Sequence, residues 1–266
     1  MLPYIHIFGR PLATYDIAIT VAWLLCGLLI VRRCRRLGVS ENRAALLVTV
    51  LVLCGLAGAK LFYLFIALLR DPARFATMSF GDYFGGGLVY YGGFFGGFAG
   101  LWLFSFIRKL PAKNNGGTFT YMRKILREYG FIIVYLPLAH AIGRVGCFLT
   151  GCCFGVENHT FGIAYHNPVP GVPVGIPLVP VQLFEAILNI VLFAILLSLH
   201  KKGRRWPTLT ATYVYSYATY RFLLEYLRFD SARGVWAGLS TSQWVSVGLV
   251  AGMFFAQVTY KRAKTR

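Results

Sequence analysis

Acidic residues are scarce in this chain, and charged residues of either sign are few. The 266 residues include 9 aspartates and glutamates against 27 lysines and arginines, and only 14% of residues are charged. A soluble globular domain usually has about a quarter of its residues charged. The composition therefore argues against a soluble protein and leaves no room for a large soluble domain.

Several well-known catalytic signatures are absent as well. The chain has no P-loop, no G-x-S-x-G motif and no H-E-x-x-H motif, so it gives no indication of the chemistries that those motifs carry. The segment MLPYIHIFGRPLATYDIAI does not begin with a basic region before an apolar core, and no small-residue cleavage site follows it. We therefore expect no cleavable signal peptide.

Apolar residues dominate what is present. They make up 57% of the chain, and the mean hydropathy is +0.62. Since a transmembrane helix needs about 20 apolar residues, the sequence predicts an all-α polytopic membrane protein with one integral membrane domain over residues 1–266. About seven spans are expected, at 13–31, 43–68, 88–107, 130–150, 181–199, 208–227 and 241–260.

The basic residues predict how these spans are oriented. Nineteen of the 27 lie at span ends facing one side and five on the other side, while Lys60, Arg144 and Arg221 lie inside spans. The more basic side should be cytoplasmic, which places the N-terminus outside and the C-terminus in the cytoplasm. Topology and attraction to anionic lipid then explain the net charge of +18, and no nucleic-acid partner is expected.

Two outward-facing segments are rich in glycine. Residues 81–100 read GDYFGGGLVYYGGFFGGFAG, and glycine at this density weakens a helix and lets the backbone approach a ligand or another helix. We expect a re-entrant loop over Gly85–Gly93; for the later glycines, close helix packing is an equal alternative. Residues 151–180 also contain many prolines and should form an outer loop with little helix.

Arg144 and Arg221 are the main functional candidates. A cation at membrane depth costs ~3 kcal/mol on insertion scales, so it usually faces a hydrated cavity or an anionic partner. Two of them suggest one anion-binding cavity within the bilayer. His140, Arg144 and Cys147 are spaced i, i+4, i+7 and should share a helix face. The alternative for Arg144 is a pair with an acid on another helix that serves assembly alone.

Acidic residues near these arginines are further candidates. Glu225 is expected to neutralise or orient Arg221, and Arg228 is expected near the surface, where a self-contained ion pair is the alternative. Gln182 and Glu185 begin the fifth span. Glu185 either orients a cation, acts as a base, or is a helix N-terminal acid with no further role.

Cys147, Cys152 and Cys153 lie close together in the sequence at the outer end of the fourth span. Free thiols, a disulfide and a metal site all stay open, because oxidising conditions outside the membrane permit a disulfide. Three thiols without a paired C-x-x-C are a weak signal for zinc. No metal and no cofactor are therefore predicted.

Five segments resemble motifs of the prolipoprotein diacylglyceryl transferase family. GRVGCFLTGCCFG resembles its signature, roughly G-R-x-G-N-F-x-N-x-E followed by a glycine. YYGGFFGG resembles its F-H-G-G segment, and VPVQLFEA resembles H-P-T-Q-L-Y-E. YRFLLEYLRFD resembles R-F-x-x-E-x-x-R, and GLSTSQWVS resembles G-L-S-x-S-Q-x-x-S. The order and spacing agree over nearly the whole chain.

The resemblance implies transfer of a diacylglyceryl group from phosphatidylglycerol to the lipobox cysteine of a preprolipoprotein, with release of glycerol phosphate, in the bacterial plasma (inner) membrane. It implies that Arg144 and Arg221 hold the phosphate, with no metal or nucleotide. The substrate-binding candidates, including matched family positions, are Tyr15, Gly92, Gly93, Cys147, Gly155, Gln182, Glu185, Glu225 and Arg228.

The chain also departs from the family pattern. Tyr91 stands where the family has histidine, Cys147 and Thr150 replace two asparagines, and Cys152 replaces the glutamate. The base that would activate the acceptor thiol is therefore displaced, and His140 and Tyr91 are the candidates for it, although an unperturbed tyrosine has a pKa near ~10. A divergent transferase with another acceptor and a non-catalytic lipid-binding protein stay as alternatives.

Overall fold

The computed structural model describes residues 1–7, 10–79, 83, 89–109, 117–169, 172–229 and 235–265. Within these ranges the chain is mostly helical, and its strands form only two-stranded pairs. Two compact units can be separated. The first comprises Met1–Leu28 and Phe131–Arg266, and the second comprises Leu29–Gly130.

The apolar character of the chain is concentrated on long helices. Four segments of the described chain are long and apolar enough to cross a membrane: Thr14–Leu37, Glu41–Leu69, Thr118–Thr150 and Val181–Lys201. Large apolar side chains are also exposed, with Leu24 at 67% and Phe255 at 69%. Lipid is the solvent that suits such a surface. The prediction of a multi-pass helical membrane protein is confirmed.

Helices also form at the other three predicted spans. They are α5 (Tyr90–Lys109), α9 (Trp206–Leu224) and α10 (Thr241–Thr265). Within α5, Phe95–Ile107 is a shorter apolar stretch. That these three helices cross the membrane, that the N-terminus lies outside, and that the chain acts as a single membrane domain stay predictions.

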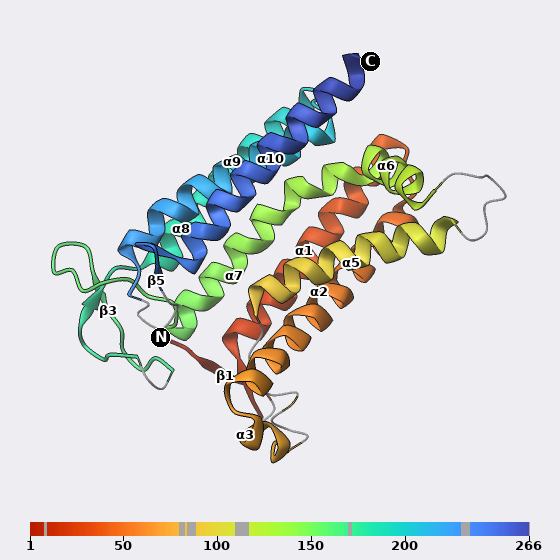
Figure 1. The fold of residues 1–266 in the computed structure, drawn as a ribbon. Helices are drawn as coiled ribbons and strands as arrows, with labels where there is room; N and C mark the ends of the chain where they lie inside the picture. Colours follow the sequence, from red (N-terminus) through yellow and green to blue (C-terminus); the bar gives the residue numbers. More distant parts are fainter. Residues whose placement is uncertain are drawn as a thin grey trace. The chain divides into compact units, whose positions relative to one another are not determined.

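In the first unit, α7 packs against α8, α8 against α9, and α9 against α10. Figure 1 labels these four helices. A 3₁₀ turn, η1 (Gly130–Tyr135), leads into α7 (Leu136–Thr150), and α8 spans Val181–Lys201. A second 3₁₀ turn, η2 (Glu225–Leu227), continues α9. Prolines occupy the first turns of α7 and α9, where no backbone N–H donor is needed.

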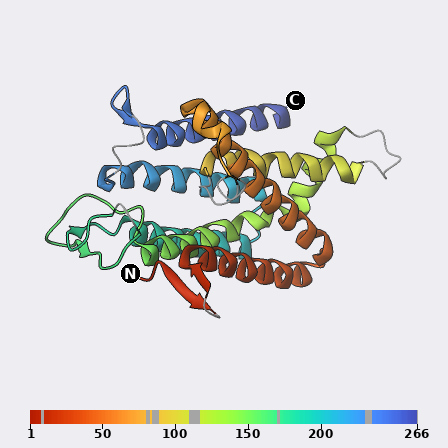
Figure 2. The ribbon, with the colours of Figure 1, turned by 90° about the horizontal axis from the view of Figure 1, so that it is seen from below.

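Hairpins and loops join the ends of these helices. Strands β1 (Tyr4–Ile7) and β2 (Arg10–Ala13) pair before α1 (Thr14–Leu37) (Figure 2). The segment after α7 carries the short pair β3 (Ile163–Ala164) and β4 (Pro177–Leu178). The prediction of little helix here is confirmed for the described residues, whereas its outer location stays a prediction. Strands β5 (Val235–Trp236) and β6 (Leu239–Ser240) lead into α10.

The second unit is built on α2 (Glu41–Arg70), which packs against α5. Ser40 caps α2, with its hydroxyl accepting a hydrogen bond from the backbone N–H of Arg43 at 3.4 Å. The unit also contains the short helix α3 (Pro72–Ala76) and the helix α6 (Thr118–Tyr129).

Glycines allow α2 and α5 to come into backbone contact. A Cβ atom placed on Gly92 would lie 2.3 Å from the carbonyl oxygen of Gly58, and one on Gly96 would lie 2.1 Å from that of Cys54. The expected re-entrant loop is therefore wrong for Gly92 and Gly93, which belong to α5, because contact with α2 stabilises the helix despite its glycines. Residues 84–88 lie outside the described part of the chain.

This contact predicts how two neighbouring glycines respond to substitution. We expect Gly96→Ala to lower the thermal unfolding midpoint in detergent, by an equivalent of about 1–3 kcal/mol, because the α2 backbone must move. Gly97→Ala is the matched control, since a Cβ there meets nothing within 4 Å, and its midpoint should hold or rise. Equal effects of the two substitutions would contradict close packing at Gly96.

Candidate active site

The first charged group of the site joins α7 to α8. Nη2 of Arg144 donates a hydrogen bond to Oε1 of Glu185 at 3.0 Å. Nε of Arg144 lies 3.0 Å from Oε2 of the same carboxylate, an ion-pair contact that lacks hydrogen-bond alignment. Glu185 is fully buried, with 0% exposure. The ion pair with an acid on another helix, given above as the alternative for Arg144, is therefore present, and an anion-binding role stays a prediction.

His140 reaches the same carboxylate from one turn earlier on α7. Its Nε2 lies 3.4 Å from Oε1 of Glu185, and its ring packs on Tyr217 of α9 with centroids 5.6 Å apart. The predicted shared face for His140 and Arg144 is confirmed, since both contact Glu185.

Two polar residues that sequence reasoning missed extend this group. Nδ2 of Asn189 donates to the backbone carbonyl of Glu185 at 2.8 Å, and the hydroxyl of Tyr220 donates to Oδ1 of Asn189 at 2.9 Å. The link therefore runs from α8 to α9. Asn189 could have been found from the sequence, because it is a polar residue within an apolar span, four positions after Glu185.

The second charged group lies where α9 ends. Nη1 of Arg221 is 2.8 Å from Oε2 of Glu225, and Nη2 donates to Oγ of Ser242 on α10 at 3.1 Å. Nε of Arg228 is 3.9 Å from the same Glu225 oxygen. The prediction that Glu225 neutralises Arg221 is confirmed. Ser242 was missed as a single residue, although it lies in the quoted segment GLSTSQWVS.

The expectation that Arg228 lies near the surface is wrong. Its side chain is only 2% exposed. The reason is the loop after α7, which returns to this point and forms a β-bridge between Gly155 and Arg228. A loop from 73 positions earlier in the chain covers the arginine, so its burial cannot be read from the local sequence.

The two charged groups belong to one electrostatic cluster. Arg221 and Arg228 both lie close enough to Glu185 to interact with its carboxylate, as Arg144 does. Three guanidinium groups therefore surround two carboxylates in a largely buried region, which leaves one positive charge in excess. Unpaired charges are costly in such surroundings, and the cluster is therefore suited to an anion.

Gly155 and Gln182 hold the loop after α7 against the rest of the unit. The backbone N–H of Gly155 donates to the carbonyl of Val179 at 2.8 Å, and a Cβ on Gly155 would lie 2.2 Å from the carbonyl oxygen of Leu227. Nε2 of Gln182 donates to the Cys152 carbonyl, and Oε1 accepts from the Tyr165 hydroxyl at 3.3 Å. These contacts position the loop, and direct substrate contact by either residue stays a prediction.

Tyr165 is a buried residue that helps to position this loop. It has 0% exposure, and burial raises the pKa of its phenol above the usual value. The phenol therefore stays protonated at neutral pH and can donate its hydrogen bond to Gln182 throughout that range.

Tyr15 lies on the part of α1 that packs against α7. A Cβ on Gly146 would lie 2.6 Å from Cβ of Ala18 and 3.5 Å from Cα of Tyr15, so Gly146 permits this approach. Tyr15 is close enough to Arg144 to interact with it electrostatically. The structure therefore brings Tyr15 to the cluster, as the resemblance implied.

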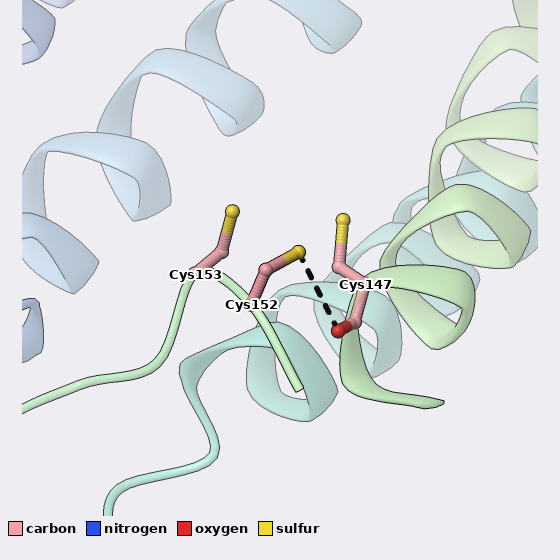
Figure 3. A group of neighbouring side chains, drawn as sticks. All are labelled: Cys147, Cys152 and Cys153. Atoms are coloured by element: carbon pink, nitrogen blue, oxygen red, sulfur yellow. Dashed lines mark hydrogen bonds between the residues drawn. The ribbon is translucent and has the colours of Figure 1, made fainter. Parts of the chain in front are cut away.

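Three thiols gather beside the cluster (Figure 3). The sulfur atoms of Cys147, Cys152 and Cys153 all lie within 4.8 Å of one another, and all six cysteines of the chain are free thiols. The cations Arg144 and Arg228 lie close enough to Cys153 to interact with it electrostatically.

The remaining candidates belong to the second unit. Tyr91, Gly92 and Gly93 lie in the first turn of α5. Close packing against α2 explains why position 92 is a glycine. That these three residues contribute to the active site stays a prediction.

Fold and site together define a multi-pass helical membrane protein with a buried cluster of arginines and glutamates. A family model described as prolipoprotein diacylglyceryl transferase matches residues 3–259, and the chain belongs to this family. The family expected from the five sequence motifs is therefore confirmed.

Individual relatives match over nearly their whole length. The chain is 32% identical over 251 residues to phosphatidylglycerol–prolipoprotein diacylglyceryl transferase 2 of Clostridium perfringens, with 93% of this chain and 90% of the relative covered. It is 28% identical over 254 residues to the corresponding transferase of Clostridium tetani, with 94% of each covered. A relative from Clostridioides difficile is 26% identical over 249 residues, with 93% and 90% covered.

The buried pair predicts strong coupling between Arg144 and Glu185. Breaking a buried ion pair from one side costs about 3–5 kcal/mol, because the other charge is left uncompensated. We expect Arg144→Met and Glu185→Gln each to lower the unfolding midpoint strongly, and the double variant to recover much of the loss. A double-mutant cycle on thermal unfolding in detergent measures this coupling.

The matched control is the exposed pair Arg35–Glu41, whose side chains are 68% and 37% exposed. The same substitutions there should show a coupling of at most about 1 kcal/mol, as for surface ion pairs. Additive effects at Arg144 and Glu185 would contradict the ion pair.

Proposed function

We propose that this protein transfers the diacylglyceryl group of phosphatidylglycerol to the lipobox cysteine thiol of preprolipoproteins and releases glycerol phosphate. The observation that carries the proposal is the buried cluster of Arg144, Arg221 and Arg228 around Glu185 and Glu225, with its excess of one positive charge. The names of its relatives state both a phosphatidylglycerol donor and a prolipoprotein acceptor.

The donor phosphate matches this cluster in charge and in hydrogen bonding. A phosphodiester has a single negative charge, which equals the excess of the cluster. Nε of Arg144 and Nη1 of Arg221 are buried and have no aligned hydrogen-bond acceptor among the described residues. Each is therefore a donor for a phosphate oxygen, and the planar guanidinium fork suits that geometry.

An apolar groove in the same unit suits an acyl chain of the donor. It lies between α9 and α10, has a volume of about 630 Å³, and is lined by residues that include Phe222, Val247 and Phe254. This volume is within the usual range of about 300–1,000 Å³ for small-molecule sites. Phe222 follows Arg221 directly in the chain. In the proposed arrangement, a lipid with its phosphate at Arg221 extends a tail into this groove.

The proposed reaction is a substitution at a glyceryl carbon. The acceptor sulfur attacks this carbon, the bond from carbon to the phosphate oxygen breaks, and glycerol phosphate leaves with the bonding electrons. Arg144 and Arg221 stabilise the charge that develops on the departing phosphate. Their position at that oxygen lowers the barrier more than it strengthens binding of the intact lipid.

His140 is the proposed base for the acceptor thiol. It is held by Glu185, whose Oε1 lies 3.4 Å from its Nε2, in the manner of a base oriented by a carboxylate. The proton passes from the thiol to His140 and then to the leaving phosphate. Tyr91, at the position of the family's histidine, is the second candidate.

The membrane setting follows from the same proposal. The four segments of the described chain that are long and apolar enough to span fit a bacterial plasma membrane, with the site towards the outer side and the C-terminus in the cytoplasm. Phosphatidylglycerol and the signal-peptide region of the acceptor then both approach from the membrane.

Purified protein, phosphatidylglycerol with a labelled diacylglyceryl group and a lipobox peptide test the proposal. We expect label on the peptide and equimolar glycerol phosphate, with both products reduced at least about 1000-fold by Arg144→Ala or Arg221→Ala. A peptide with serine in place of its cysteine should stay unlabelled. Arg35→Ala changes an exposed arginine and is the control, which should retain activity.

The products also separate the competing functions. Release of glycerol phosphate without labelling of any lipobox peptide would favour a divergent transferase with another acceptor, which the changes at Tyr91, Cys147 and Cys152 make a specific alternative. No release under any condition, with phosphatidylglycerol still bound, would favour a non-catalytic lipid-binding protein.

The base assignment makes a separate prediction. We expect His140→Gln to lower kcat at least about 100-fold with little change in the KM for phosphatidylglycerol, because His140 acts on the acceptor. Tyr91→Phe removes only a hydroxyl and should leave kcat within a few-fold of the parent. Loss of turnover in Tyr91→Phe alone would assign the base to Tyr91 instead.

A further inference from the structure

The three clustered thiols carry no chemical step of the proposed transfer reaction, and substrate contact by Cys147 stays a prediction. Cys147 lies in the last turn of α7, and Cys152 and Cys153 follow directly after the turn that ends this helix. Their sulfurs come within 4.8 Å of one another, from a segment of only seven residues (Figure 3). Cys147 is buried and the other two are half-buried.

The backbone is bent in a way that brings these sulfurs together. Gly151 ends α7 with φ at +83° in the left-handed region, and Cys153 has φ at +64°. A positive φ is uncommon for a residue with a side chain and often marks a functional position. The turn is secured from two sides, because the Cys152 N–H donates to the Cys147 carbonyl at 3.1 Å and the Cys152 carbonyl accepts from Gln182.

We infer that Cys147, Cys152 and Cys153 form a binding site for one thiophilic metal ion, of the class of zinc or copper(I). Thiolate sulfur is the preferred ligand of such ions. A metal–sulfur bond of about 2.3 Å places three sulfurs about 4 Å apart. The three sulfurs therefore need to move by less than about 1 Å to bind one ion, and a water completes the coordination of zinc.

A metal ion here would tie the end of α7 to the start of the following loop. That loop continues to Gly155, which forms the β-bridge with Arg228. The ion would therefore secure the segment that buries Arg228 beside Glu225. Without a paired C-x-x-C, the cysteine spacing predicts this site only weakly. The turn at Gly151 brings the three sulfur atoms together in the folded chain.

Cobalt(II) titration of the full-length, reduced protein in detergent tests the site. We expect one cobalt ion per chain, with a sulfur-to-cobalt charge-transfer band that zinc displaces, and a higher unfolding midpoint when metal is bound. Cys153→Ser and Cys147→Ser should each weaken binding at least tenfold. Cys54→Ala, which removes a thiol from α2, is the matched control and should bind as the parent does.

Three results would overturn the inference. One is the absence of a charge-transfer band in the reduced parent protein, which decides the question even where a variant fails to fold. Another is a band that persists after all three cysteines are changed to serine. The third is protein isolated from cells without metal and with two of these thiols joined in a disulfide. None of these results bears on whether the chain transfers diacylglyceryl groups.

Discussion

A guanidinium group within an apolar helix is the constraint on which this structure depends. Such a charge is stable only beside an anion or water, and Arg144 finds its anion in Glu185, 41 positions further along the chain. This pairing fixes α7 against α8. Arg221 is stabilised in the same way by an ion pair with Glu225 and a hydrogen bond to Ser242, and the second of these contacts connects α9 to α10. The helices that carry the charges are thus held together by the charges.

The same ion pairs leave some N–H donors of the cluster without an aligned acceptor. A buried network in which every donor has an aligned acceptor has no donor left for a hydrogen bond to a ligand. Here Nε of Arg144 and Nη1 of Arg221 contact carboxylates without alignment, and three cations face two carboxylates. That mismatch lowers the stability of the cluster, and binding of a phosphate would correct it. The stabilisation of the bundle and the proposed affinity for an anion therefore have a common origin.

Loop contacts decide features that local sequence does not. Runs of apolar residues predicted the helices, and the spacing of His140 and Arg144 predicted that they share a face. The burial of Arg228 could not be foreseen, because it depends on a bridge to Gly155 that only the folded loop creates. Gly92 was assigned to a loop since glycine weakens an isolated helix, whereas contact with Gly58 outweighs that tendency. Ser242 and Asn189 are visible in the sequence as polar residues, yet Arg221 and Tyr220, which contact them, lie on a different helix.

The central claim is that Arg144 and Arg221 hold one phospholipid phosphate together. An experimental density map of the protein in nanodiscs rich in phosphatidylglycerol tests it most directly. The account predicts phosphate density with oxygens about 2.7–2.9 Å from nitrogen atoms of both guanidinium groups, and a lipid tail along the groove between α9 and α10. A map with the phosphate bound elsewhere, or with the two guanidinium groups unable to reach one phosphate, would contradict it.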